Sequence, residues 1–206
     1  MASITRGSAA SAKRQTTTEK RLLDATQRLL EAGESFTELG VQRIAEEADV
    51  ARSSFYAHFA DKTELLLALA RRLSLIAYDA HDRWNPAGDE ALPDLVDGFV
   101  AIVSHYRLHA SILAAVLEVA AYDRAVSRFW DDQLSLFRER ACSWLETEQT
   151  GGRTSPALDP GVAARIVVDG GMRIIADHVV NGAAGDDGRV ARELALIWWH
   201  GAYRRP

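Results

Sequence analysis

The sequence is poor in cysteine and has no long hydrophobic run. Cys142 is the only cysteine among 206 residues, so no disulfide can form within the chain, which is typical of proteins in a reducing compartment. No apolar run reaches the roughly 18 residues that a membrane-spanning helix requires. Residues 1–16 contain basic residues but no apolar stretch, which argues against a secretory signal. These absences predict a cytoplasmic protein that does not enter a membrane.

Strand signals are missing as well, because no segment alternates regularly between apolar and polar residues. Apolar residues instead recur at every third or fourth position through most of the chain, as they do along one face of a helix. With 48% hydrophobic residues the chain has enough apolar surface for a packed core. The sequence therefore predicts an all-α fold of about nine helices without a sheet.

The helical pattern divides the chain into three parts. Residues 1–16 are rich in serine, alanine and threonine and are expected to form a disordered basic arm. Residues 17–62, in which the first helix begins at Thr17 or Thr18, predict a small three-helix domain. Residues 63–206 contain longer periodic segments, which predict a helical bundle.

Charge is distributed unevenly between these parts. The net charge of the chain is −5, yet residues 1–62 contain nine basic and nine acidic residues and are neutral overall. The acidity therefore lies in the predicted bundle. The N-terminal part remains able to present a local basic face to phosphate groups.

Two short helices are predicted close together, at Val41–Ala48 and Arg52–Phe59. Only three residues separate them, and the small side chains of Ala45 and Ala48 allow the helices to pack as a compact angled pair. Asp49 occupies the tight turn, where a left-handed backbone is expected and aspartate is tolerated better than most residues. The second helix would expose side chains suited to a groove of DNA: Arg52, Ser53, Ser54, Tyr56 and His58.

Three motifs follow one another in this region. They are Ile44-Ala45 in the first helix, Phe55-Tyr56-Ala57-His58-Phe59 in the second, and Asp61-Lys62-Thr63-Glu64-Leu65 directly after it. Together they resemble the TetR family of bacterial repressors, and the resemblance covers about fifty residues. It implies that residues 17–62 are a helix-turn-helix DNA-binding domain and that residues 63–206 bind a ligand and dimerise.

The segment departs from the family pattern at four positions. Asp49 stands where glycine is usual, Gly40 where serine or threonine is common, and Ala60 where proline is common. Ala51 replaces a capping serine or threonine, which weakens the second helix by roughly 1 kcal/mol. None of these changes removes a hydrogen-bond donor needed for DNA.

The resemblance implies a set of DNA contacts. Tyr56 would bind a backbone phosphate, with His58 near one, and Lys62 would hold another phosphate beside the amides that begin the next helix. The residues that would face bases or sugar–phosphate are Gln42, Arg52, Ser53 and Ser54. The N-terminal arm is expected to stay a solvated tail, with contact to the minor groove as the alternative for Arg6, Lys13 and Arg14.

The resemblance also assigns roles to the predicted bundle. The chain would be a homodimer on a palindromic operator, and a small apolar ligand in a helical cavity would release it from the DNA. The expected ligand contacts, which helical spacing alone would assign to the core, are Phe99, Tyr106, Trp130, Phe137, Trp144 and Met172. The expected dimer contacts are Gly170, Ile174, Ile197, Trp198 and Tyr203. The aromatic tail around Trp198 and Tyr203 is faintly similar to the ethionamide-resistance regulators of actinobacteria, a branch that binds elongated apolar molecules.

Other functions remain open at this point. His105 and His109 are spaced to share one helix face, but no third ligand is placed to complete a metal site, so neither a metal nor a cofactor is expected. A helical enzyme or carrier is the second class, although no nucleophile with an adjacent base and no phosphate loop is present. A third possibility is a DNA-binding dimer with a filled core that responds to no small ligand.

Overall fold

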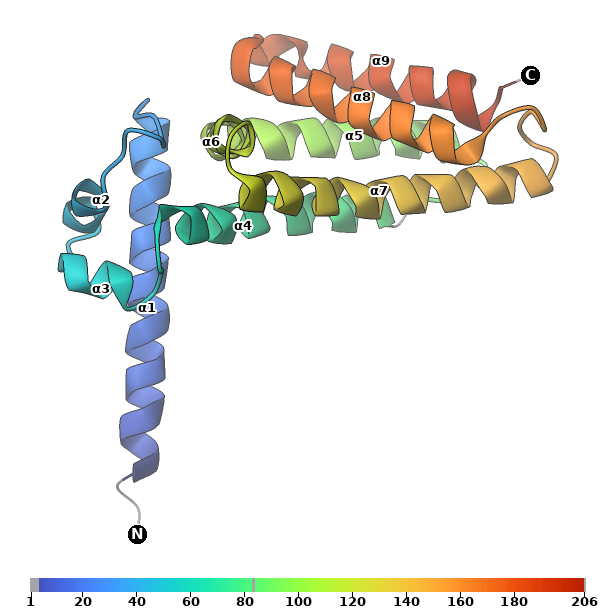
Figure 1. Ribbon diagram of the computed structural model, residues 1–206. Helices are drawn as coiled ribbons and strands as arrows, with labels where there is room; N and C mark the ends of the chain where they lie inside the picture. Colours follow the sequence, from blue (N-terminus) through green and yellow to red (C-terminus); the bar gives the residue numbers. More distant parts are fainter. Residues whose placement is uncertain (1–3, 83, 206) are drawn as a thin grey trace.

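The computed structural model describes the backbone of residues 4–82 and 84–205 and the side chains of residues 17–71, 73 and 84–205. Within these ranges every regular element is a helix (Figure 1), which confirms the predicted all-α class. A short 3-10 turn precedes α9 and a π-helical turn over Trp199–Tyr203 follows it. The nine α-helices are α1 (Ile4–Glu31), α2 (Val41–Glu47), α3 (Arg52–Tyr56), α4 (Lys62–Asp82), α5 (Ala91–Leu108), α6 (Ala110–Ala120), α7 (Arg124–Thr150), α8 (Pro160–Asn181) and α9 (Asp187–Trp198).

The first helix is longer than the sequence predicts. It begins at Ile4 instead of Thr17 or Thr18, so residues 4–16 are helical and not disordered. This segment lacks proline and contains several alanine, lysine, arginine and glutamine residues, which favour helices. A helix nucleated by its packed C-terminal half extends at little cost per residue. The side chains of Arg6, Lys13 and Arg14 lie outside those described, so their contact with a minor groove stays a prediction.

Helix α1 stands across one end of the molecule, with α2 and α3 packed on one side of it and the bundle α4–α9 extending from the other (Figure 1). In the bundle, α5 packs against α4, α8 and α9, and α7 packs against α6 and α8. The fold therefore separates a small α1–α3 unit from a long helical body and joins the two through α4 and α6.

One core extends from the small unit into the bundle. Leu22 of α1, Ile44 of α2 and Phe55 of α3 are fully buried in it. Ile112 and Val116 of α6 belong to the same buried cluster. These α6 residues therefore pack directly against the small unit.

The end of α5 is tied to the α8–α9 junction by a single arginine. Arg107 Nη1 donates to the carbonyls of Val179 and Gly182 at 2.6 and 3.1 Å, and Nη2 donates to that of His178 at 3.1 Å. The guanidinium also pairs with Asp187 at 2.7 Å. Its hydrogen bonds, together with that from His178, hold the pKa of Asp187 below the usual range although burial opposes this. The C-terminal end of α8 is thereby fixed to the bundle.

No single helix in the described part of the chain combines the length and the apolar character of a membrane span. Helices α5 and α6 pass that test only as a pair, and they are bent by 81° relative to each other.

Candidate functional site

The turn between α2 and α3 is held in a left-handed conformation. Asp49 has a φ of 51°, as expected for this turn. Arg21 of α1 donates from Nη2 to the carbonyl oxygen and to Oδ2 of Asp49, at 2.7 and 2.8 Å. Glycine would adopt this φ more easily, but it would provide no carboxylate for Arg21. Aspartate at this position therefore anchors the turn to α1.

One flank of α3 is fixed in the core. Phe55 is fully buried, and its ring lies 5.8 Å from that of Phe59, which is also buried. The helix spans Arg52–Tyr56 and is shorter than the predicted Arg52–Phe59, although Phe59 still donates its N–H to the carbonyl of Phe55 at 2.9 Å. Ala51 makes no side-chain cap, as the sequence predicts. Core contacts, more than local hydrogen bonds, hold this helix in place.

The opposite flank of α3 is turned to the outside. Arg52, Ser53 and Tyr56 are exposed, whereas Ser54 and His58 are half-buried. The guanidinium of Arg52 lies 5.7 Å from the Tyr56 ring centroid and 3.4 Å from its hydroxyl. The structure thus brings together a cation, a phenol and hydroxyls on one face, a combination suited to phosphates and base edges.

Gln42, the predicted contact on α2, is exposed beside this face. Its amide donates to Glu46 Oε1 at 2.8 Å. A contact with DNA would require the side chain to exchange that intrahelical bond for one to a base or a sugar.

Lys62 does not have the environment that the sequence analysis predicts. Its Nζ donates to three carbonyl oxygens of the α1–α2 loop (residues 32–40), namely those of Phe36, Thr37 and Leu39, at 3.1, 2.9 and 2.6 Å. An ammonium group has three donors, so all are used within the protein. Burial lowers the pKa of Lys62, while Glu118 acts in the opposite direction. This geometry gives Lys62 a structural role, and the predicted phosphate contact stays a prediction.

Side chains on both sides of its first turn cap the start of α4. Asp61 Oδ1 accepts the N–H of Glu64 at 2.9 Å, and Glu64 Oε2 accepts the N–H of Ala60 at 2.6 Å. These two bonds satisfy donors on both sides of the helix start. They also fix the segment that links α3 to the bundle.

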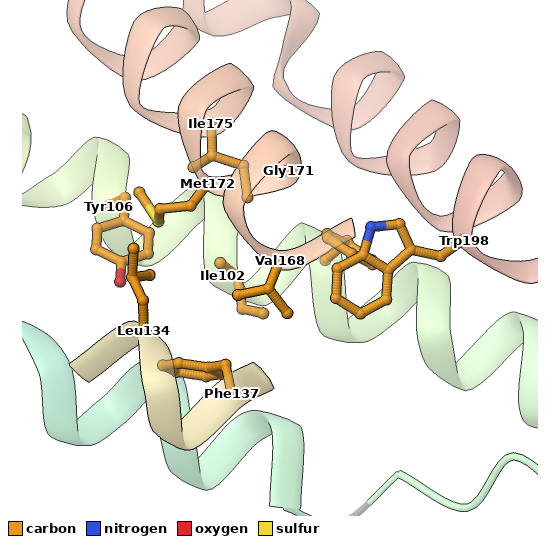
Figure 2. A pocket seen from close by; sticks show the side chains of 10 residues that line it. Ile102, Tyr106, Leu134, Phe137, Val168, Gly171, Met172, Ile175 and Trp198 are labelled. Atoms are coloured by element: carbon orange, nitrogen blue, oxygen red, sulfur yellow. The ribbon is translucent and has the colours of Figure 1, made fainter. Parts of the chain in front are cut away.

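A small apolar pocket lies inside the bundle between α5, α7, α8 and α9 (Figure 2). Its volume is about 50 Å³. Four of the six predicted ligand residues line it: Phe99, Tyr106, Phe137 and Met172. The pattern of apolar residues does not distinguish a pocket wall from filled core, and for that reason sequence analysis missed Ile102, Leu134, Val168, Gly171, Ile175 and Trp198.

Tyr106 supplies a polar group to this inner pocket. The side chain is 4% exposed, and burial raises its pKa to about 12, so it is a neutral phenol at physiological pH. A phenol hydroxyl on the wall of an apolar pocket can donate one hydrogen bond to a bound molecule.

The other two predicted ligand residues are placed elsewhere. Trp144 packs edge-on against Trp84, with ring centroids 5.0 Å apart, and does not line the inner pocket. Trp130 lies in a second, larger hollow of about 500 Å³ between α6, α7 and α8. This outer cleft shares Leu134 and Met172 with the inner pocket, so the two hollows adjoin.

The predicted dimer residues fall into two groups. Gly170, Ile174 and Ile197 are exposed on α8 and α9, where a second copy can reach them. Trp198 and Tyr203 are instead 5% and 0% exposed. Both belong to the core of the bundle, so the prediction that they lie at a dimer interface is wrong for this conformation. Trp198 ends α9, which packs against α5, and Tyr203 lies in the π-helical turn that contacts α7.

His105 and His109 are neighbours but lack further metal ligands. Their rings lie 4.9 Å apart, and a ring nitrogen of His105 bonds to the carbonyl of Leu73 at 2.9 Å. No group of three or more metal-ligating side chains occurs among the described residues. Burial lowers the pKa of His109, and the neighbouring His105 adds to this effect.

Comparison with known proteins agrees with the helix-turn-helix geometry. Residues 22–69 match the family model of bacterial regulatory proteins of the tetR family. A segment of 59 residues is 39% identical to a protein of Haemophilus influenzae described as an uncharacterized HTH-type transcriptional regulator. That segment is 29% of this chain and 29% of the Haemophilus protein, so the match spans less than a third of either.

Solved structures of similar fold cover nearly the whole chain. NalD, the secondary repressor of the MexAB-OprM multidrug efflux pump in Pseudomonas aeruginosa, has a TM-score of 0.74 at 19% identity, over 94% of this chain and 100% of that one. GusR of Salmonella enterica has a TM-score of 0.71 at 16% identity, over 89% and 94%. A regulator from Saccharomonospora viridis in complex with choline has a TM-score of 0.67 at 17% identity, over 92% and 100%. At these identities the similarity shows the fold.

Proposed function

The chain has the DNA-binding segment and the fold of the TetR family of bacterial regulators, and from this premise we propose that it is a homodimeric repressor that a small ligand releases from a palindromic operator. Such a protein is a regulator and not an enzyme, and it acts where the DNA is, in the cytoplasm. NalD, which has the same fold, is described as a repressor.

The observation that carries the proposal is the two-sided environment of α3. Phe55 and Phe59 hold one flank in the core, while Arg52, Ser53 and Tyr56 project from the other. A helix held in this way presents its polar flank in a fixed orientation, as a reader of the major groove requires. In the proposed complex Arg52 contacts bases and Tyr56 contacts a phosphate. Gln42 and Ser54 contact bases or sugar–phosphate, and His58 lies near a phosphate.

An exposed apolar stripe on α8 supports a dimer. Val162, Ile166, Gly170 and Ile174 follow one another at intervals of four residues and are all exposed, and Ile197 of α9 is 62% exposed. Soluble monomers rarely leave such a row uncovered. In the proposed dimer α8 and α9 pack against their copies, and the two α3 helices lie about 34 Å apart, which is one turn of DNA.

The inner pocket supports an apolar ligand. Aromatic and aliphatic side chains form nearly all of its wall, and Trp198, part of the tail that resembles the ethionamide-resistance regulators, is among them. The regulator from Saccharomonospora viridis is in complex with a small molecule, choline. We propose that a bound molecule displaces α4 and α6, widens the separation of the α3 helices and so prevents simultaneous contact with both half-sites.

The size of the inner pocket also favours a second candidate. A volume of about 50 Å³ accepts only a few small groups unless side chains move. A DNA-binding dimer with a filled core, responsive to no small ligand, fits that size. Mass spectrometry of the native protein purified from its host distinguishes the two, because only the ligand-responsive regulator would carry or acquire a bound molecule.

Selection from random duplex DNA tests the proposed function directly. The full-length protein should enrich an inverted repeat, and exchange of one half-site for an unrelated sequence should weaken binding sharply. Enrichment of no duplex, or of an asymmetric single site bound by a monomer, would show that the proposal is wrong.

A further inference from the structure

Glu118 of α6 lies between the outer cleft and the DNA-binding unit. The residue forms part of the wall of the cleft, together with Trp130 of α7 and Asp177 of α8. Its Oε1 also accepts hydrogen bonds from the hydroxyls of Ser35 and Thr37 in the α1–α2 loop, from Ser35 at 3.1 Å. One carboxylate therefore faces a hollow and a loop of the helix-turn-helix unit at once.

The α1–α2 loop that Glu118 holds is connected to α3, the helix proposed to read DNA. The hydroxyl of Tyr122, just after α6, lies 2.7 Å from Thr37 Oγ1 and adds a second contact from the same side. From the other side the Nζ of Lys62 binds the carbonyls of Thr37 and Leu39. Lys62 begins α4, directly after the segment that leads out of α3. Hydrogen bonds therefore connect Glu118 to the α1–α2 loop, which precedes α2, and to the start of α4, which follows α3.

The wall of the outer cleft is acidic, although the nearby Lys62 partly balances the charge of Glu118. Of its three acidic residues, Asp169 pairs with Arg138 at 2.7 Å. Neither Glu118 nor Asp177 forms an ion pair with any described side chain. Arg173 is the one cationic residue of the cleft wall. The half-buried Trp130 adds an indole ring, whose face attracts cations.

Adjoining this acidic cleft is the apolar inner pocket, whose wall includes Tyr106. Leu134 and Met172 belong to both walls. A single molecule can therefore occupy both hollows if one end is charged and the other is apolar. Because the outer cleft is acidic, the charged end should be a cation. Because the inner pocket is small, the apolar end should be short.

We propose that the outer cleft binds the cationic head of an amphipathic amine whose short apolar tail enters the inner pocket, and that this head competes with Ser35 and Thr37 for the Glu118 carboxylate. An ammonium group forms stronger hydrogen bonds to a carboxylate than a hydroxyl does. Its binding weakens the hold on the α1–α2 loop and lowers the affinity for DNA. This inference rests on the proposed function and specifies its ligand class and its positioning residue.

The first test compares three probes of one chain length: hexylammonium, hexanoate and hexanol. Calorimetric titration of the full-length protein without DNA should show binding of hexylammonium about tenfold tighter than binding of the other two. Equal or tighter binding of hexanoate or hexanol would overturn the proposed ligand class. Because no DNA is present, this result does not depend on the operator.

The second test separates the role of Glu118 in signalling from a role in folding. Glutamine keeps an oxygen that accepts from Ser35 and Thr37, so Glu118→Gln should fold and bind DNA as the unchanged protein does. The variant should lose most of the roughly tenfold preference for hexylammonium. This probe should also no longer release it from DNA. The matched control Glu139→Gln, at an exposed position of α7, should retain both properties.

The outcomes distinguish this inference from the proposed function. If Glu118→Gln still binds hexylammonium normally and is released from DNA by it, the proposed role of Glu118 is wrong. The proposed function as a DNA-binding regulator is then unaffected. If the unchanged protein binds hexylammonium with the stated preference but selects no duplex, the ligand class stands and the proposed function fails. If hexanol releases the unchanged protein from DNA and hexylammonium does not, the proposed role of Glu118 is wrong. That result would support an apolar inducer.

Discussion

Arg52 has the freest charged group on the outward flank of α3. Among the described residues its guanidinium has one hydrogen-bond partner, Tyr56, whose hydroxyl lies 3.4 Å away. By contrast, Arg21 and Arg43 are engaged with Asp49 and with Glu34, respectively. An arginine that is held loosely can turn toward a base edge without losing a strong internal contact.

Replacement of Arg52 by alanine is therefore expected to weaken binding to the selected operator by about 1–3 kcal/mol and to relax the choice of base at one position in each half-site. Fluorescence anisotropy with a panel of single-base operator variants measures both effects. Arg128→Ala, on the exposed side of α7, is the control and should bind the whole panel as the unchanged protein does. Retained base preference in Arg52→Ala would remove this residue from base readout.

Lys62 has internal contacts that the sequence does not reveal, and its phosphate contact stays a prediction. Its position at the start of α4 suggests a phosphate contact, but the carbonyls that bind its ammonium come from residues 23 to 26 positions earlier. No sequence pattern reveals that these carbonyls converge there. Asp49 is the opposite case, because the three-residue turn is short enough for local backbone rules to predict its conformation.

Lys62→Met is expected to lower the free energy of unfolding by roughly 1–3 kcal/mol, because it leaves three carbonyl oxygens without their donor. Its effect on the salt dependence of DNA binding should be small. A phosphate contact would instead lower the salt slope by about one without a loss of stability. Thermal unfolding, together with binding titrations at several salt concentrations, decides between the two.

At the scale of helices, α3 is short and has no side-chain cap. Ala51 has the extended backbone of an N-cap residue, with φ −68° and ψ 148°, but has no side chain that can accept a hydrogen bond. Sequence analysis predicted the missing cap correctly, since it depends on one residue type at one position. It overestimated the length of α3, because the last residues, which include Phe59, are held by burial and not by a continued helical ladder.

Ala51→Ser is expected to stabilise the protein by about 1 kcal/mol, because serine at this position can accept an N–H of the first turn of α3. The melting temperature should rise. Ala57→Ser at the other end of the helix is the matched control, where a hydroxyl offers no such cap, and it should leave the melting temperature nearly unchanged. A decrease for Ala51→Ser would mean that the backbone at residue 51 differs from the N-cap geometry described above.

The sequence predicts which face of a helix points inward better than it predicts which residues border a pocket. Phe99, Tyr106 and Met172 were correctly placed toward the interior of the bundle, since helical periodicity identifies the inward face. Periodicity does not show which inward residues border a void, and Trp144 was misassigned for this reason. Trp198 and Tyr203 were assigned to the wrong side because periodicity at the end of the chain does not show which face of α9 packs against α5.

At the scale of the whole molecule, a buried ion cluster joins the end of α7 to the C-terminal segment. Glu148 is fully buried and pairs with Arg153 at 2.7 Å and with Arg204 at 2.6 Å. Burial raises the pKa of Glu148, but the hydrogen bonds from both arginines outweigh this effect and lower the pKa below its usual range. Arg204 also donates to the carbonyl of Pro86, which precedes α5.

This cluster makes the stability sensitive to acid. A carboxylate whose pKa is lower in the folded state contributes its stabilisation at pH values above its unfolded pKa, near 4.3 for glutamate. The contribution is lost as the pH falls through the folded value. The melting temperature should therefore drop steeply in that acidic range. Glu148→Gln should be less stable at neutral pH and show a shallower decline, whereas an unchanged decline would assign the acid sensitivity to other groups.

The exposed apolar stripe on α8 is the proposed dimer interface, and a charge placed in it tests this proposal. Ile174→Arg is expected to yield monomers in sedimentation experiments, because a charge in the centre of an apolar interface is costly to bury. The same variant should bind a half-site far more weakly than the dimer binds the full operator. Leu108→Arg, at a side chain that is 73% exposed at the end of α5, should remain dimeric. A dimer of Ile174→Arg with full operator affinity would place the interface on another face.

Hydroxyl-radical footprinting of the full-length protein on its selected operator tests the central claim most directly, namely that the outward flank of α3 reads DNA. We expect two protected stretches related by a two-fold axis, centred about one helical turn apart, and their loss in Arg52→Ala. A single protected stretch, or a footprint that Arg52→Ala leaves unchanged, would contradict the account.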